Sequence, residues 1–133
     1  MPKRIVVNVD GGARGNPGPA AIAAIVSTPE GRVIESRGEA IGRATNNVAE
    51  YRALLLGIGR ARELGASQVE LVGDSELVVR QVKGEYRVKD DGLRKLHDQV
   101  REALAELERW SIRHVRREQN ADADRLVNEV LDR

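Results

Sequence analysis

Residues 5–19 read Ile5-Val6-Val7-Asn8-Val9-Asp10-Gly11-Gly12-Ala13-Arg14-Gly15-Asn16-Pro17-Gly18-Pro19, and this stretch decides the fold. The β-branched run at 5–9 predicts a strand that is buried on both faces and lies in the middle of a sheet. We expect the strand to stop at Asp10, because the two glycines that follow can adopt positive φ and admit another backbone closely. The Gly, Asn and Pro residues after them predict a tight turn. Asp10 is then either a turn cap or a functional acid.

The composition predicts one domain over residues 1–133 with a single core. Lys and Arg number 22 against 21 Asp and Glu, so a polyanion would need a local binding site. Cysteine is absent, which excludes disulfides and thiolate metal sites. We see no signal peptide and no apolar run of membrane length. These features predict a cytoplasmic protein without a membrane partner, and we expect a monomer.

The rest of the chain changes from strand periodicity to alternating strands and helices. Strands at 20–27 and 32–41 follow the first strand through short turns, which predicts a three-stranded antiparallel meander. The further predicted elements are a helix at 48–64, a strand at 68–73, a helix ending near 81, a charged loop at 84–91, a helix at 93–107, a strand at 110–115 and a helix at 120–131. This order predicts an α/β fold whose five-stranded mixed sheet adds two parallel strands to the meander and is flanked by helices.

The first predicted helix is apolar on nearly every side, which is typical of a buried helix. Gly57 and Gly59 lie inside it and lower its intrinsic stability. We interpret them as positions where another backbone comes close.

Four acidic residues fall at positions where a core is expected. Asp10 and Asp74 each end a predicted buried strand, and parallel neighbouring strands would bring them to one edge of the sheet. Glu50 lies in the first turns of the buried helix, and Asp124 lies in the last helix. Asp122 competes with Asp124, because the helical periodicity separates the two only slightly.

Each acid also has a local structural explanation. Asp74 precedes Ser75 and could cap a helix, Glu50 could complement a helix dipole, and Asp124 could be a solvated surface residue. These explanations do not account for acids that converge, because like charges held together repel unless a cation binds between them. Oxygen ligands without Cys or His indicate Mg²⁺ or Mn²⁺. Two such ions can clamp the attacking and leaving oxygens of a phosphoryl displacement.

Four motifs together resemble the ribonuclease H type I family, in family order and over nearly the whole chain. They are Asp10-Gly11-Gly12-x-x-Gly15-Asn16-Pro17-Gly18-Pro19, Thr45-Asn46-Asn47-Val48-Ala49-Glu50, Asp74-Ser75 and Asn120-x-x-Ala123-Asp124-x-Leu126. The resemblance implies the family's RNase H-like fold and cleavage of the RNA strand of RNA–DNA hybrids, leaving 5′-phosphate and 3′-hydroxyl ends. It also implies that the chain's partner is an RNA–DNA hybrid duplex and that two Mg²⁺ or Mn²⁺ ions bind with substrate.

The resemblance further implies roles for single residues. Asp10 would contact both ions, Asp124 the ion that activates water, and Glu50 with Asp74 the ion near the leaving oxygen. The family register selects Asp124 over Asp122. Substrate contacts are implied for the residues that match the hairpin and first-helix motifs: Gly11, Asn16, Thr45, Asn46 and Asn47. An enzyme can distinguish RNA from DNA by the 2′-hydroxyl, which amide groups can bind without reading sequence.

The chain departs from well-studied bacterial members in two loops. The loop at 115–120 lacks their histidine, and the segment at 84–91 is too short for their basic insertion, so the chain resembles a compact, archaeal-like subgroup. The dense cationic cluster nearest to the predicted acidic site is Arg113, Arg116 and Arg117, just before the helix that carries Asp124. We expect Arg116 and Arg117 to bind substrate phosphates, because guanidinium groups suit phosphate oxygens.

Three other classes fit the sequence less well. Actin-like phosphotransferases also begin with a strand, an acid and a Gly-rich hairpin, but they need a second lobe. Members of the wider integrase and resolvase superfamily share the metal-bearing sheet but do not match Asn46 and Asn47. A non-catalytic hybrid-binding module should lack one of the four acids, and all four are present.

Overall fold

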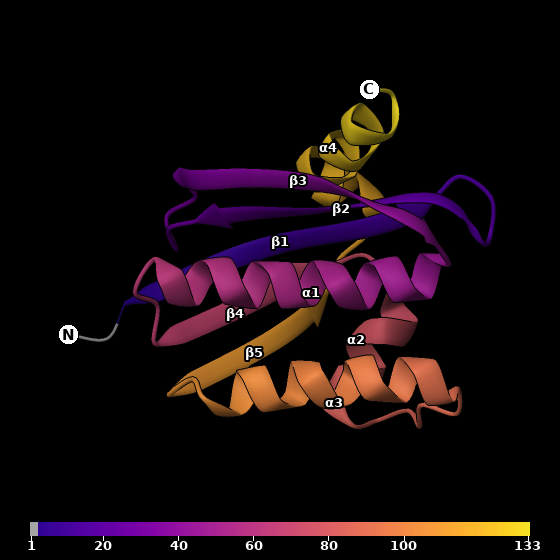
Figure 1. The fold of residues 1–133 in the computed structure, drawn as a ribbon. Helices are drawn as coiled ribbons and strands as arrows, with labels where there is room; N and C mark the ends of the chain where they lie inside the picture. The colour runs from indigo at the N-terminus through magenta and orange to yellow at the C-terminus, as the bar shows by residue number, and fades with distance from the viewer. Residues whose placement is uncertain (1–2) are drawn as a thin grey trace.

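The computed structural model describes residues 3–133, and it contains one five-stranded sheet in the order β3-β2-β1-β4-β5 (Figure 1). The strands are β1 (Arg4–Ala13), β2 (Gly18–Ser27), β3 (Val33–Ala44), β4 (Gln68–Gly73) and β5 (Arg109–His114). The helices are α1 (Asn46–Glu63), α2 (Glu76–Lys83), α3 (Asp91–Ala105) and α4 (Ala121–Leu131), with a 3₁₀ turn, η1 (Arg117–Asn120), before α4.

The strand directions confirm the predicted mixed sheet. β1, β2 and β3 pair antiparallel as a meander. β4 runs parallel to β1, and β5 runs parallel to β4. The central position of β1 follows from its apolar residues, since Ile5, Val7 and Val9 are all buried. The carboxyl end of β4 therefore lies beside the middle of β1, where Asn8 pairs with Val72 two residues before Asp10.

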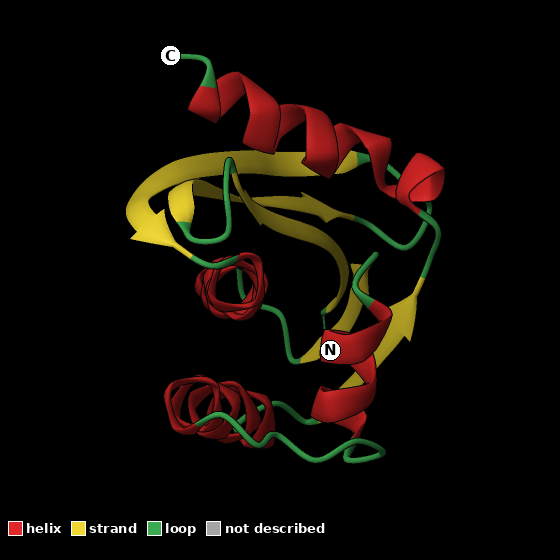
Figure 2. Cartoon of the chain, turned by 90° about the vertical axis from the view of Figure 1, so that its right-hand side faces the viewer, coloured by secondary structure: helices red, strands yellow, loops and turns green. Residues whose placement is uncertain are grey.

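Helices cover the two faces of the sheet unequally. α1 lies along one face, and α3 packs on the outer side of α1, whereas α4 crosses the opposite face over the meander (Figures 1 and 2). This explains why α1 is apolar on nearly every side: it packs against strands on one side and a helix on the other. Tyr51, Leu54 and Ile58 of α1 belong to the main core. A smaller core beneath α4 joins Ala21 and Ala23 of β2 to residues of that helix.

The first strand is longer than predicted, and this corrects our interpretation of its glycines. β1 continues through Gly11 and Gly12 to Ala13, and the positive φ of the hairpin is at Gly15. Gly11 is required for space instead, because a Cβ there would lie 2.3 Å from the carbonyl oxygen of Ala49 in α1. β1 and α1 thus approach each other backbone to backbone at the residue after Asp10.

The two glycines inside α1 differ in how much space a side chain would have. A Cβ at Gly57 would lie 2.8 Å from a methyl carbon of Val7, so Gly57 does allow close packing, but against side chains of the sheet and not against the backbone that we predicted. Gly59 is exposed, and nothing lies within 4 Å of a Cβ at that position, so our interpretation of Gly59 was wrong.

In the part of the chain that the structure describes, no helix has the length and apolar character needed to cross a membrane.

Candidate active site

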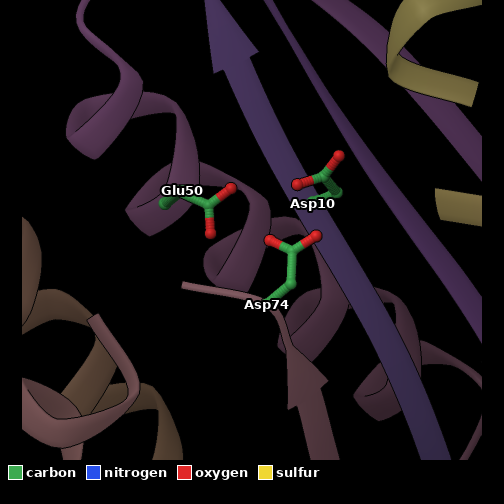
Figure 3. A group of neighbouring side chains, drawn as sticks. All are labelled: Asp10, Glu50 and Asp74. Carbon is green, nitrogen blue, oxygen red and sulfur yellow. The ribbon is translucent and has the colours of Figure 1, made fainter. Parts of the chain in front are cut away.

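Three of the four predicted acids meet at the edge of the sheet. Asp10 lies in β1, Glu50 lies in the second turn of α1, and Asp74 directly follows β4. Their carboxylates point toward one another (Figure 3). One oxygen from each lies within 4.8 Å of the others, which is close enough for one cation to contact all three.

Glu50 is held in place by the strand that carries Asp10. The backbone N–H of Gly11 donates a 2.8 Å hydrogen bond to Oε1 of Glu50. This bond depends on the close approach of β1 and α1 that the missing side chain of Gly11 allows. Glu50 therefore does not act as a helix-dipole residue in solvent, because its side chain is buried and directed toward the sheet.

Asp124 lines the same cleft from α4. The cleft has a volume of about 410 Å³, and all four acids line it. Asp124 is half-buried and close enough to Asp10 to raise its pKa, although it is outside the group of three carboxylates. Asp122, the competing residue, is exposed and pairs with Arg125. The helix thus directs Asp124 into the cleft and Asp122 away from it.

The electrostatics of the cleft disfavour negative charge. Burial raises the pKa of Asp10 to about 7, with further contributions from Asp74 and Asp124. Burial and then the charge of Asp10 raise the pKa of Glu50 well above its usual value. The pKa of Asp74 is also raised by burial, and Arg117 and Asn120 partly offset this effect. Neighbouring carboxylates that cannot all ionise favour a bound cation.

The donor set fits a divalent metal ion. Oδ2 of Asp74 is buried and has no hydrogen-bond partner among residues 3–133, which is costly unless a ligand satisfies it. The group of three consists of carboxylates alone, a set of hard oxygen ligands that suits Mg²⁺ or Mn²⁺. The acidic cluster therefore has the chemistry of a metal site.

Of the substrate residues predicted in the hairpin and the first helix motif, Gly11, Asn46 and Asn47 line the cleft and Asn16 and Thr45 do not, and several of them have structural roles. Thr45 caps α1, because its hydroxyl accepts a hydrogen bond from the N–H of Val48. Oδ1 of Asn16 accepts from the backbone N–H of Asn46, and Oδ1 of Asn46 accepts from that of Ala13. These bonds join the β1–β2 hairpin to the start of α1. Within residues 3–133 the side-chain amide N–H groups of Asn16 and Asn46 donate to no protein acceptor, and Asn47 lines the cleft.

The arginine cluster is divided by the structure. Arg113 donates a 2.7 Å hydrogen bond to Glu70, so it does not extend the cationic loop. Arg117 lines the acidic cleft, and its positive charge lowers the pKa of Asp74. Arg116 is exposed at the start of η1 and does not line the cleft.

Sequence reasoning did not identify two further features at the cleft. Arg14 lines it and forms a 2.6 Å ion pair with Asp132, so the hairpin contacts the end of the chain. Asn120 is buried at 2% exposure between α4 and β1. Its place in the last motif was visible in the sequence, but an asparagine before a helix ordinarily indicates a cap.

Comparisons with known proteins agree with this architecture. A family model described as reverse transcriptase-like matches residues 8–130. Ribonuclease HI of Halobacterium salinarum is 43% identical over 97% of this chain, and the chain spans 65% of that protein. A bifunctional protein of Mycobacterium tuberculosis is 44% identical over 97% of this chain, which spans 36% of it. The chain thus covers less than two thirds of the length of these curated relatives.

Solved structures give the same fold. The crystal structure of the Halobacterium RNase H1 superimposes with a TM-score of 0.95 at 43% identity, covering 97% of this chain and 98% of that one. LC11-RNase H1, isolated from compost by a metagenomic approach and crystallised with an RNA/DNA hybrid, gives 0.92 at 39% identity, covering 96% of both chains.

The sheet order and the acids at its edge define a protein with the RNase H-like fold. The chain belongs to the ribonuclease H type I family, as the four motifs predicted. This membership sets aside the actin-like and integrase alternatives.

Proposed function

We propose that this chain is a metal-dependent ribonuclease H that hydrolyses the RNA strand of RNA–DNA hybrids. The observation that carries the proposal is the group formed by Asp10, Glu50 and Asp74, whose oxygens lie within 4.8 Å in a family whose relatives are named ribonuclease HI. A protein that only bound hybrids would gain nothing from three converging carboxylates, two of them buried, whose pKa values are all raised.

The four acids would hold two Mg²⁺ or Mn²⁺ ions, which stabilise the attacking and leaving oxygens of phosphodiester hydrolysis. Asp10 interacts with each of the other three acids and would contact both ions, whereas Glu50 and Asp74 would complete one site and Asp124 the other. Gly11 would keep Glu50 oriented through its backbone N–H. Water would attack phosphorus and the bond to the 3′ oxygen would break, leaving 3′-hydroxyl and 5′-phosphate ends.

Recognition of the RNA strand would come from the hairpin and the start of α1. The oxygens of the Asn16 and Asn46 amides accept hydrogen bonds from the protein backbone, so the N–H groups of these amides would be the donors to substrate. Gly11 and Asn47 line the cleft, and Thr45 caps the helix that begins with Asn46 and Asn47. Donors fixed in this way suit the 2′-hydroxyl, which distinguishes RNA from DNA.

Arg117 and Arg116 would bind substrate phosphates next to the acids. Replacing both by Ala should weaken hybrid binding and flatten the plot of log affinity against log salt by up to about two units. Turnover at saturating substrate should change much less. Because Arg117 alone lines the cleft, its single variant should account for most of the loss. An unchanged salt slope would move the phosphate contacts elsewhere, with Lys83, Arg87 and Lys89 next to test.

The decisive experiment incubates the purified chain with an end-labelled RNA–DNA hybrid, with and without Mg²⁺ or Mn²⁺. RNA–RNA and DNA–DNA duplexes of the same sequence are the controls. We expect cleavage of the RNA strand of the hybrid only when the metal is present, with 3′-hydroxyl ends. No cleavage with either metal would refute the proposed activity, and equal cleavage of RNA–RNA would refute hybrid specificity. The single domain, the monomeric state and the cytoplasmic location remain predictions from the sequence.

A further inference from the structure

One buried polar side chain beside the acids has no role in the function proposed above. Apart from Asp10 and Glu50, the buried polar side chains in the described part of the chain are Gln81 and Asn120. Gln81 accepts a 2.6 Å hydrogen bond from Tyr51 and ties α2 to α1. Asn120 is 2% exposed and lies where η1 passes into α4, one turn before Asp124. A buried amide must be hydrogen-bonded, so its partners reveal what it does.

Asn120 does not act as a helix cap. It occupies the position before α4 where Asn commonly caps, but its side chain makes no capping hydrogen bond. Its Nδ2 instead donates a 2.8 Å hydrogen bond to the carbonyl oxygen of Val9 in β1. Val9 precedes Asp10, so one side chain connects the start of the helix that carries Asp124 to the strand position that carries Asp10.

The bonded carbonyl belongs to a residue that pairs with Ala24 of β2 but lies just beyond the pairing of β1 with β4. The parallel pairing of β1 with β4 ends at Asn8 opposite Val72, one residue before Val9. β4 then continues alongside β5, where Gly73 pairs with His114. The amide of Asn120 thus bonds to β1 just past its last pair with β4, at the point where the chain places Asp10 and Asp74.

A second amide fixes the orientation of the first. Nδ2 of Asn8 donates a 3.0 Å hydrogen bond to Oδ1 of Asn120. A carbonyl oxygen only accepts, so the Asn120 nitrogen must face Val9 and its oxygen must face Asn8. Asn8 and Asn120 therefore form a two-amide clamp between β1 and the start of α4, and the clamp has one hydrogen-bonding arrangement.

We propose that Asn120, supported by Asn8, is a positioning residue that sets the separation of Asp124 from Asp10. The proposal rests on the proposed function, since it concerns how the same acids are held for their metal ions. Asp124 follows Asn120 by four residues, about one helical turn, so a shift of the helix start moves its carboxylate with it. The other acids are held by β1, β4 and α1, whereas Asp124 reaches the cleft on a helix that packs on the opposite face of the sheet.

The test compares Asn120→Leu with Gln119→Leu. The first keeps the approximate shape of the side chain and removes both hydrogen bonds, together with the effect of the Asn120 amide on the pKa of Asp74, which Asn8→Ala below leaves in place. The second replaces an exposed amide on the neighbouring residue, which bonds only to the backbone N–H of Arg116. Three properties are measured: Mn²⁺ affinity by calorimetry without substrate, the melting temperature of the metal-free protein, and kcat and KM on the hybrid at saturating Mn²⁺.

A positioning role predicts that Asn120→Leu weakens Mn²⁺ binding and lowers kcat by about 10- to 100-fold, as removal of groups that orient metal ligands commonly does. KM should change little, because Asn120 is buried away from substrate. Gln119→Leu should resemble the wild type in all three measurements. If Asn120→Leu lowers only the melting temperature, with Mn²⁺ affinity and kcat of the folded protein unchanged, Asn120 is purely structural and the proposal is wrong.

Asn8→Ala provides the second test, and it decides the question if Asn120→Leu does not fold. It removes the support of the clamp but leaves the bond to Val9, so Mn²⁺ affinity and kcat should fall by a smaller factor. Unchanged values would overturn the role of the clamp. In the double variant the effects should not add, because Asn8 acts through Asn120. A wild-type chain that bound Mn²⁺ but cut no hybrid would refute the proposed activity alone, and the Mn²⁺ affinities would still decide the role of Asn120.

Discussion

Glu50, near the N-terminal end of α1, shares a buried space with two other carboxylates, whereas Arg60, near the C-terminal end, holds Glu35 of β3 in an ion pair. Nε and Nη2 of Arg60 donate bonds of 2.6 and 2.9 Å to the two oxygens of Glu35. These bonds lower the pKa of Glu35, while burial raises the pKa of Glu50. One helix therefore stabilises a charged carboxylate at one end and destabilises one at the other.

The difference lies in where the compensating charge comes from. Glu35 is neutralised by a side chain of the same protein, in an ion pair that is partly exposed to solvent. Glu50 faces Asp10 and Asp74. The positive charge that acts on this group of three is that of Arg117, which lowers the pKa of Asp74. The acidic end is thus incomplete without a cation from solution, as expected for a site that trades stability for function. Four predictions test this difference between the two ends of α1, from the largest expected effect to the smallest.

The largest effect is expected from Asp10→Asn. This change removes the central carboxylate, so hybrid cleavage should fall by roughly three orders of magnitude or more. Hybrid binding should persist or tighten, because repulsion toward phosphate falls. Cleavage assays and binding titrations with one labelled hybrid measure both. Asp124→Asn should also be severely impaired, whereas Asp122→Asn, at the exposed position, should remain active. Full activity of Asp10→Asn would contradict the metal-site assignment.

The stability of the metal-free protein should decrease as pH rises. The folded-state pKa of Asp10, about 7, lies above its usual value of 3.8, so the folded state retains the proton over this range. The contribution of Asp10 to the free energy of unfolding is therefore greatest below pH 4. It falls between about pH 4 and 7, by roughly 2–4 kcal/mol at most. Urea unfolding at several pH values measures the slope.

Two controls sharpen the pH experiment. Saturating Mg²⁺ should restore stability at pH 7 to 8, because a bound cation removes the repulsion among the carboxylates. Asp10→Asn should flatten the pH dependence and raise the metal-free melting temperature at neutral pH. A wild-type stability that rises between pH 4 and 7 would show that the acidic cluster is not strained.

The close approach of β1 to α1 should make Gly11→Ala costly. A Cβ at Gly11 meets the Ala49 carbonyl at 2.3 Å, whereas one at Gly12 has its nearest contact at 3.8 Å from Val127. We expect Gly11→Ala to lose about 1–3 kcal/mol, the usual cost of overpacking, and to weaken metal binding by displacing Glu50. Gly12→Ala is the matched control and should be nearly neutral. Equal melting temperatures for the two variants would contradict the packing at Gly11.

The smallest effect is expected at the other end of α1. Glu35→Gln should lower the melting temperature by a few degrees at most and leave cleavage unchanged, because a solvated ion pair contributes little. The folded pKa of Glu35 is below 4.5, so its contribution is present above that pH and lost as pH falls through the folded value. Wild type and variant should therefore converge in acid. A large loss of hybrid cleavage in Glu35→Gln would mean that the two ends of α1 are coupled.

The sequence by itself determined the element order, the mixed sheet and the four acids. Strand and helix periodicity are local properties, so β4 agrees with its predicted bounds and the other elements differ from theirs by a few residues. The acids were recognisable because carboxylates at the ends of buried strands and in a buried helix conflict with their surroundings. The motif resemblance added the choice of Asp124, which helical periodicity had left open.

Tertiary structure alone decided which groups meet. Gly11 is needed because α1 packs closely against β1 at that position. Arg113 donates a hydrogen bond to Glu70 on a neighbouring strand, and Asn120 donates one to Val9 of β1. Asn120 and Val9 are 111 residues apart in the chain. Local patterns contain no information about such distances, because they depend on how the finished sheet and its helices pack. The residue types at the cleft are therefore a property of the sequence, and the way they are held is a property of the fold.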